Sequence, residues 1–199
     1  MSLQIVTPPT VEPVTLDEVK ARLRLTSTAD DATISQQITA AREYAEKVTR
    51  RSLNVKSYAY FLDRFPYPHE PLRVPVPPLL SVTAIKYYDE TLTEQTLATA
   101  EYWVAGQQIP ALICPTPGNI WPPTARVPGA VEIDFNAGYG SVDTQGNPNG
   151  PAIPQHICEG IRQLAIHLYE HPETVTAEGL KSIPNNFETF FGANRVYVF

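Results

Sequence analysis

The distribution of proline constrains this fold more than any other feature of the sequence. Proline accounts for 20 of the 199 residues, against an average share of about 5%. Because proline lacks a backbone N–H and disfavours helical geometry at the preceding residue, it is excluded from helix interiors and central strands. The prolines cluster at 8–13, 66–78, 110–128 and 148–154. We expect helices and strands between these clusters, and an extended arm over residues 1–14.

Two amphipathic helices are predicted after the first proline cluster. Thr15 and Glu18 have the spacing of a capping box, which predicts a helix over residues 16–25. A second helix is predicted over residues 31–49, because apolar residues recur there at helical spacing. This apolar stripe consists of Ile34, Ile38, Ala41, Ala45 and Val48.

The apolar spacing changes from helical to alternating in the middle of the chain. Short runs of β-branched and aromatic residues are typical of strands, and they predict strands over 58–62, 72–74, 82–88, 102–104, 109–113 and 130–135. Asp89–Thr91 is predicted to be the tip of a hairpin. Residues 137–154, rich in glycine, proline and asparagine, are predicted to form a loop.

A third helix is predicted over residues 154–171, with Pro154 at its first position and Pro172 beyond its end. A short helical piece is expected near residues 187–191. The chain then closes on the apolar segment Val196–Phe199, which is strand-like. This segment either folds onto its own core or pairs with a neighbour's sheet edge or groove.

Together these elements predict an α+β protein. The two N-terminal helices and the C-terminal helix form a bundle, and a mostly antiparallel, β-rich subdomain is inserted into it. The predicted boundaries are 1–56 for the arm and N-terminal helices, 57–150 for the insertion, and 151–199 for the C-terminal helix and tail.

Charge and cysteine usage narrow the possible functions. The formal net charge is −6 and there is no run of Lys or Arg, whereas proteins that grip nucleic acid carry a basic patch or stripe. Cys114 and Cys158 lack zinc-ligand spacing. A disulfide between them remains open, although two free thiols fit better. We expect no signal peptide and no membrane-spanning segment.

One short motif suggests catalysis. His167, Glu170 and His171 match H-x-x-E-H, a zinc-hydrolase pattern in which two histidines bind the metal and the glutamate acts as general base. The motif is short, and Pro172 ends the helix at its second histidine. The alternative is that His171 interacts with the orphan carbonyl groups at the helix C-terminus. We therefore expect no catalytic residue, no metal and no cofactor.

Two other features have structural explanations. The segment Gly138–Gly140 lacks the rest of a phosphate-binding loop and is predicted to be a turn that needs positive φ. Trp103 and Trp121 are predicted to be core residues or interface anchors.

The order and spacing of several segments resemble phage head–tail connector proteins, the adaptor subunits that form a ring beneath the portal. The matching segments are 13–20 (PVTLDEVK), 38–46 (ITAAREYAE), 62–66 (LDRFP), 77–82 (PPLLSV), 128–131 (PGAV), 135–140 (FNAGYG), 165–170 (AIHLYE) and 195–199 (RVYVF). The chain resembles the long-insert branch of this family, which is also found in gene transfer agents.

The resemblance implies a structural virion protein rather than an enzyme. It would form a ring, of twelve copies in the family, between the portal and a tail, neck or stopper protein. DNA would pass through the lumen without specific binding, which suits an acidic protein. The chain would reside at the head–tail junction of the virion, after assembly in the host cytoplasm. The alternatives are another neck or tail-completion protein, and the zinc hydrolase.

The resemblance also suggests where the contacts with partners lie. The bundle is expected to form the ring. The candidates for docking on the portal are Arg195, Val196, Tyr197, Val198 and Phe199. The candidates for contacts within the ring are Pro8, Pro9, Trp103 and Trp121.

Overall fold

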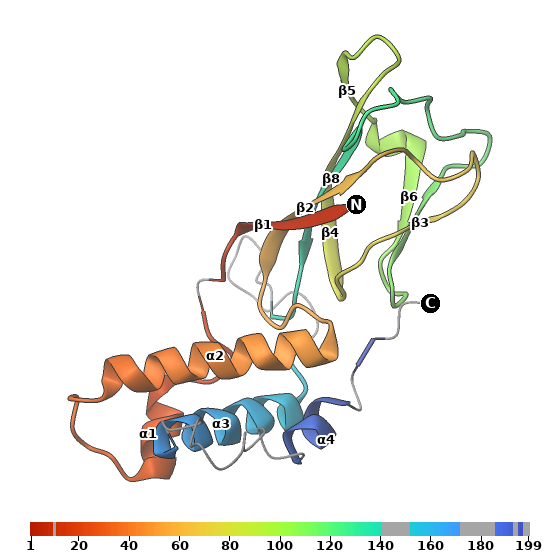
Figure 1. Cartoon of the computed structure of the whole chain (residues 1–199). Helices are drawn as coiled ribbons and strands as arrows, with labels where there is room; N and C mark the ends of the chain where they lie inside the picture. The colour runs from red at the N-terminus through yellow and green to blue at the C-terminus, as the bar shows by residue number, and fades with distance from the viewer. Residues whose placement is uncertain (10, 141–151, 172–185, 193–194, 197–199) are drawn as a thin grey trace, which may run out of the picture. The chain divides into compact units, whose positions relative to one another are not determined.

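The computed structural model describes residues 1–9, 11–140, 152–171, 186–192 and 195–196. These residues form two compact units. The β unit consists of residues 1–9 and 54–140, and the helical unit consists of the remaining described residues. Figure 1 shows the elements of both units. The combination of helices and antiparallel sheets confirms the predicted α+β class.

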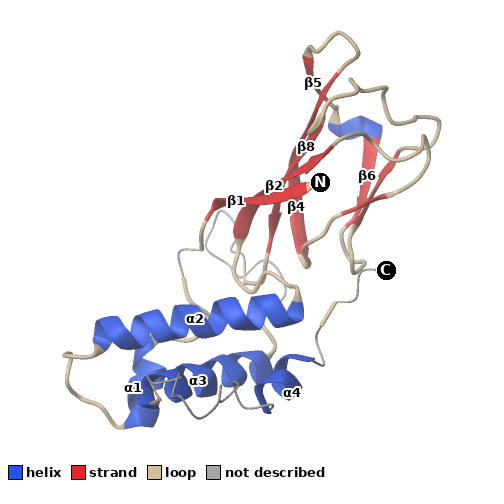
Figure 2. Ribbon diagram, in the orientation of Figure 1, coloured by secondary structure: helices blue, strands red, loops and turns tan. Residues whose placement is uncertain are grey.

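The helical unit contains four helices, coloured blue in Figure 2: α1 (Leu16–Leu23), α2 (Asp31–Thr49), α3 (Gln155–Glu170) and α4 (Asn186–Gly192). Helices α2 and α3 make the most extensive contact, and both α1 and α4 pack against this pair. The apolar stripes predicted from sequence supply the core. Its fully buried members include Ile34, Ile157, Ile161 and Leu164.

The ends of these helices follow from local chemistry. The predicted capping box is present: Thr15 Oγ1 accepts from the backbone N–H of Glu18 at 3.3 Å, and Glu18 Oε2 accepts from that of Thr15 at 2.9 Å. Helix α1 ends two residues earlier than predicted because Arg24 has left-handed geometry, with φ of 57°. Pro154 is the N-cap of α3 rather than its first residue, as its ψ of 130° is not helical.

A network of charged side chains around the buried Arg42 connects the segment before α1, helix α2 and the segment after α2. The Arg42 side chain is buried; its Nε donates to Glu12 at 2.8 Å and its Nη1 donates to Glu46 at 2.9 Å. Burial alone would lower the pKa of Arg42, but the hydrogen bond to Glu12 and the charge of Glu46 raise it. Glu46 also accepts the backbone N–H of Leu53. One arginine thus fixes both the segment before α1 and the segment after α2.

The β unit contains two antiparallel sheets. The larger has the order β1-β2-β8-β4-β5 and the smaller has the order β3-β7-β6. Their bounds are β1 Ser2–Thr7, β2 Lys56–Leu62, β3 Leu72–Arg73, β4 Leu79–Tyr88, β5 Glu94–Thr96, β6 Tyr102–Ala105, β7 Leu112–Pro115 and β8 Val131–Ala137. Side chains from both sheets form one hydrophobic core, in which Tyr58 stacks on Phe135.

Strands β2, β4 and β8 are longer than predicted, with β4 beginning at Leu79 rather than at residue 82, and the structure also differs from the prediction at β1, β5 and β7. The predicted arm contains strand β1, which pairs with β2 and groups with the β unit rather than with the helices. Strand β5 was not predicted because its three residues, Glu94–Thr96, are polar and exposed. Strand β7 begins at Leu112 rather than at residue 109, because Pro110 cannot donate to a ladder.

Candidate functional site

The histidines of the H-x-x-E-H motif lie at the end of α3. The backbone N–H of His171 donates to the His167 carbonyl at 3.0 Å, and His171 Nδ1 lies 3.2 Å from the same oxygen. The two rings stack with centroids 4.6 Å apart. Within the described part of the chain, no three His, Cys, Asp or Glu side chains gather as metal ligands. His171 therefore occupies the helix-terminal role given as the alternative to zinc binding.

The neighbouring residues of α3 stabilise the helical unit. The Tyr169 hydroxyl donates to Asp30 Oδ2 at 3.1 Å, and this hydrogen bond raises the pKa of the tyrosine.

Cys158 is a free, half-buried thiol whose pKa is raised chiefly by burial, and Cys114 is also free. A raised pKa disfavours the reactive thiolate. We find no activated nucleophile at these positions.

The Gly138–Gly140 segment has the predicted positive φ at both glycines but forms a parallel β-bridge between Tyr139 and Asn54 rather than a turn. Gly138 and Gly140 have φ of 138° and 72°. A Cβ on Gly138 would lie 2.1 Å from the carbonyl oxygen of Asn54. Close backbone approach therefore requires glycine at position 138.

The two tryptophans have different positions. Trp121 is only 5% exposed; it stacks on Phe65 and its Nε1 donates to the Glu70 carbonyl at 2.9 Å. Trp121 thus belongs to the hydrophobic core of the β unit. Trp103, on β6, is 62% exposed. Of the two tryptophans, only Trp103 offers an apolar anchor on the surface.

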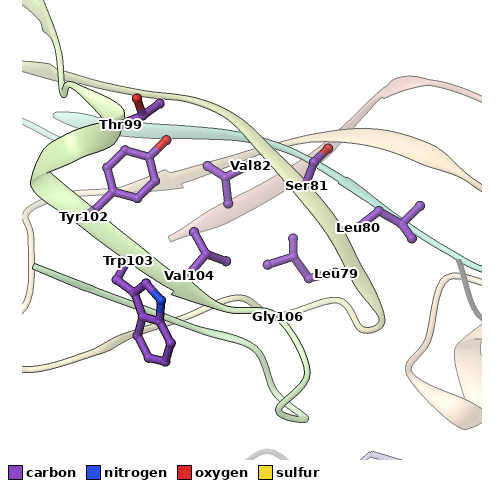
Figure 3. A pocket seen from close by; sticks show the side chains of 9 residues that line it. All are labelled: Leu79, Leu80, Ser81, Val82, Thr99, Tyr102, Trp103, Val104 and Gly106. Atoms are coloured by element: carbon purple, nitrogen blue, oxygen red, sulfur yellow. The ribbon is translucent and has the colours of Figure 1, made fainter. Parts of the chain in front are cut away.

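Trp103 lies beside an open groove in the β unit. The groove has a volume of about 440 Å³ and is lined by Leu79, Leu80, Ser81, Val82, Thr99, Tyr102, Trp103, Val104 and Gly106. Figure 3 shows the side chains of Leu79 and Val82 on β4 and of Tyr102 and Val104 on β6 turned toward the space between the two strands. None of the lining residues carries a charge. The groove is an apolar surface without catalytic groups.

A second apolar surface is the strand β1 itself. Every residue from Ser2 to Thr7 is exposed, including Leu3, Ile5 and Val6. The strand contains no charged side chain and no proline. Native proteins protect edge strands with charges, prolines or coverage. An uncovered apolar edge is therefore a candidate for contact with another chain.

The remaining contact candidates lie where the chain passes between the units or near its end. Pro8 is exposed and Pro9 is half-buried, directly after β1. Arg195 is exposed, whereas Val196 is buried and its N–H donates to the Thr49 carbonyl at 3.0 Å. Val196 thus packs within the helical unit instead of offering a free docking side chain. Tyr197, Val198 and Phe199 lie outside the described residues.

The sequence did not predict two of these surfaces, strand β1 and the groove between β4 and β6. The uncharged alternation of Ser2–Thr7 is a strand signal, but the neighbouring prolines favoured an arm instead. The groove has no sequence signature, because β4 and β6 are brought together only by the packing of the two sheets.

No helix in the described ranges combines the length and apolar character required to cross a bilayer.

Comparison with known proteins agrees with the resemblance derived from the sequence. Residues 13–100 match the sequence model of the family described as phage gp6-like head-tail connector protein. No curated protein matches the chain.

Similar chains occur in solved structures of gene transfer agent (GTA) particles. A chain in the neck of an empty GTA particle, computed with C6 symmetry, has 21% identity and a TM-score of 0.76. Chains in the virion of a native GTA particle and in its neck computed with C12 symmetry both have 22% identity, with TM-scores of 0.73 and 0.72. Each comparison covers 100% of this chain and 97% of the other.

These findings bear on the fold and on the family resemblance. The similarity to the GTA chains establishes a shared fold over the whole length. The resemblance to phage head–tail connector proteins is confirmed by the family match, which covers α1, α2 and strands β2 to β5.

Proposed function

We propose that this chain is a structural subunit of a ring that joins the portal to the tail and extends the DNA channel. The observation that carries the proposal is the family match over residues 13–100, together with the likeness of the whole chain to chains from GTA necks and virions. The exposed apolar surfaces without a catalytic constellation support a structural rather than an enzymatic role. The chain acts at the head–tail junction after assembly in the host cytoplasm.

A cyclic arrangement suits the observed surfaces. A ring needs one patch of a subunit to fit a different patch on the next copy. The β unit offers two unlike apolar surfaces, β1 and the groove beside Trp103. The similar GTA necks were computed with C6 and C12 symmetry, which supports a ring of six or twelve copies. The negative net charge lets DNA pass through the lumen without adhering.

Residues 197–199 are the proposed portal-docking segment, with Arg195 beside it. Val196 anchors this segment through its burial and its hydrogen bond to Thr49. The test variant therefore replaces residues 197–199 with Gly-Ser-Gly and leaves Val196 in place. This variant has the same length as the wild-type chain and leaves the core of the helical unit unchanged.

The measurement is retention of the chain on immobilised portal protein. We expect the wild-type chain to be retained and the Gly-Ser-Gly variant to be lost. Retention of the variant would contradict docking through this segment but leave the connector role standing. Failure of the wild-type chain to bind portal, with the chain found on the tail tube of particles, would instead favour a tail-completion protein.

A further inference from the structure

The larger sheet of the β unit has two open edges of different character. At one end, β1 pairs with β2 on one side, and no described strand pairs with its other side. At the other end, β5 covers only the last part of β4, where it pairs with residues 86–88. Residues 79–84 of β4 therefore have no strand partner on the side away from β8 among the described residues. Both free edges are six residues long, about 20 Å of strand.

At the β1 edge, the core face of the larger sheet is only partly covered. Leu3 is paired with Tyr60 and Ile5 with Tyr58, so these four side chains lie on the same face of the sheet. Tyr58 is buried in the core, but Leu3 and Ile5 remain 40% and 56% exposed. The face that forms the core of this unit thus continues beyond the layer that covers it.

The β4 edge has the complementary feature. Leu79 is paired with Ala137 and Val82 with Phe135, so both lie on the core face of the same sheet. Here the core face borders the groove toward β6, where Tyr102 and Val104 face these two residues (Figure 3). At this edge the sandwich is open, and an additional strand with apolar residues on its core face would close it.

Neither edge carries a charge that would oppose pairing between them. Residues 2–7 (SLQIVT) and residues 79–84 (LLSVTA) contain neither a charged residue nor a proline. Edges that must remain free are normally blocked by such residues. The ladder between β4 and β8 is irregular between Leu79 and Ser81 and between Val82 and Ala84. These bulges increase the local twist, so we expect a short ladder supported chiefly by apolar packing.

We propose that β1 of one copy adds to residues 79–84 of the next copy, and that Leu3 and Ile5 fill the groove there. This inference rests on the proposed function, because it supplies the contact between neighbouring subunits of the ring. The contact is heterologous, with different surfaces on the two copies, and a rotation that closes converts it into a ring.

The strand directions within one copy support this arrangement. Strand β1 is antiparallel to β2, β2 is antiparallel to β8, and β8 is antiparallel to β4. Strands β1 and β4 therefore run in opposite directions in the sheet. Rotation about an axis parallel to the strands preserves these directions, so β1 of one copy meets β4 of the next in an antiparallel pair. This is the more stable form of pairing.

Cysteine cross-linking tests the pairing directly. Gln4 lies opposite Ala59, on the face away from Leu3 and Ile5, and Ser81 is an exposed residue of the β4 edge. The double variant Gln4→Cys, Ser81→Cys is placed in the full chain and assembled into particles, which are oxidised and then denatured without reductant. The matched control is Gln4→Cys, Glu90→Cys, because Glu90 is exposed in the hairpin beyond the other end of β4.

We expect the double variant to give a ladder of covalent oligomers and the control to give none. Each single variant alone should give no product, whereas a mixture of the two single variants should give dimers. Cross-linking of Gln4→Cys to itself would overturn the proposal in favour of a two-fold contact between β1 strands. Absence of a ladder in necks that contain the chain would overturn it and leave the connector role intact. Absence of the chain from the neck would instead contradict the proposed function.

A charge substitution provides an independent test. Ile5→Lys places a charge on the core face of β1, and Gln4→Lys places the same charge on the opposite face. Because an unpaired charge is costly to bury, we expect Ile5→Lys to reduce incorporation into necks by about tenfold or more. Gln4→Lys should retain most incorporation. Equal incorporation of the two variants, with unchanged circular dichroism, would overturn the proposal.

Discussion

The helical unit and the β unit differ in how many large apolar side chains they leave exposed. In the helical unit, the buried Arg42 pairs with Glu12 and Glu46, whereas the buried Nε of Arg162 on α3 has no hydrogen-bond partner. In the β unit, large apolar side chains remain on the surface. Among the described residues, every large exposed apolar side chain except Val11 belongs to the β unit. Exposed apolar surface is therefore concentrated in the β unit, which is why we propose that the β unit makes the contacts between copies.

This contrast sharpens the expectation from sequence. The helices were expected to form the ring, because the family resemblance places a bundle there. The exposed strand β1 and the groove beside Trp103 instead suggest that the β unit makes the contacts between copies. Variants placed in each unit can test whether the two regions are as distinct as their surfaces indicate.

The largest expected effect comes from the core of the β unit. Phe135 is 1% exposed and stacks on Tyr58. Phe135→Ala removes a buried aromatic ring and should lower the free energy of unfolding by about 3–5 kcal/mol. Amide hydrogen exchange should then lose protection mainly in β2, β4 and β8. Equal loss of protection in α2 and α3 would contradict the division into two independent cores.

The charged network of the helical unit should give the next largest effect. Arg42→Met leaves the carboxylates of Glu12 and Glu46 without their cation and should cost about 3 kcal/mol. Denaturant unfolding measures this change. The matched control is Glu43→Gln, since the exposed Glu43 carboxylate lies 3.6 Å from Arg42 Nη2 and should contribute less than about 0.5 kcal/mol. Similar losses of unfolding free energy in both variants would contradict a larger contribution from the buried pairs of Arg42 than from its exposed pair with Glu43.

A pair of glycines tests the close backbone approach directly after β8. Gly138→Ala would bring a Cβ within 2.1 Å of the Asn54 carbonyl oxygen and should destabilise the β unit by about 2 kcal/mol. Gly118 also has positive φ, but a Cβ there meets nothing within 4 Å. Gly118→Ala should cost only about 1 kcal/mol. Thermal unfolding compares the two, and equal shifts would remove close approach as the cause.

The smallest effect concerns the hairpin between β4 and β5. Hydrogen bonds from Thr91 Oγ1, the Thr93 N–H and Gln95 Nε2 to the Asp89 carboxylate lower its pKa from 3.8 to about 2. A lowered folded-state pKa means that the stabilisation is present above 3.8 and is lost as the pH falls toward 2.

An NMR titration of the Asp89 carboxyl carbon measures this pKa. Asp89→Asn should weaken exchange protection of the hairpin at neutral pH but match the wild type at the acid end of the titration. An Asp89 pKa at its ordinary value would contradict the turn geometry.

The sequence predicted the regular elements of the helical unit well and the edges of the β unit poorly. The bounds of α2 agree with the prediction because its apolar stripe and the charges at both ends favour the same helix. Strand β1 was hidden by the prolines that follow it, and β5 by its polar composition. Strand β1 is defined by pairing with residues 57–61, more than fifty positions away, and β5 by hairpin pairing with residues 86–88; local propensity encodes neither pairing.

The candidate contacts show the same limit. Trp103 and Trp121 are the same residue type, yet Trp103 is exposed and Trp121 lies in the core. Only the packing of β6 and of the 115–125 segment separates them. Likewise the apolar tail was predicted as one surface, but Val196 is anchored by Thr49. The sequence identified residue types that are common in interfaces, but it could not show which of these residues remain exposed after folding.

A reconstruction of the intact neck by electron cryomicroscopy would show where the chain lies and which surfaces its copies share. The predicted result is a closed ring of this chain in contact with the portal, with β1 of each copy beside residues 79–84 of its neighbour. A chain found on the tail tube, away from the portal, would contradict the proposed connector function.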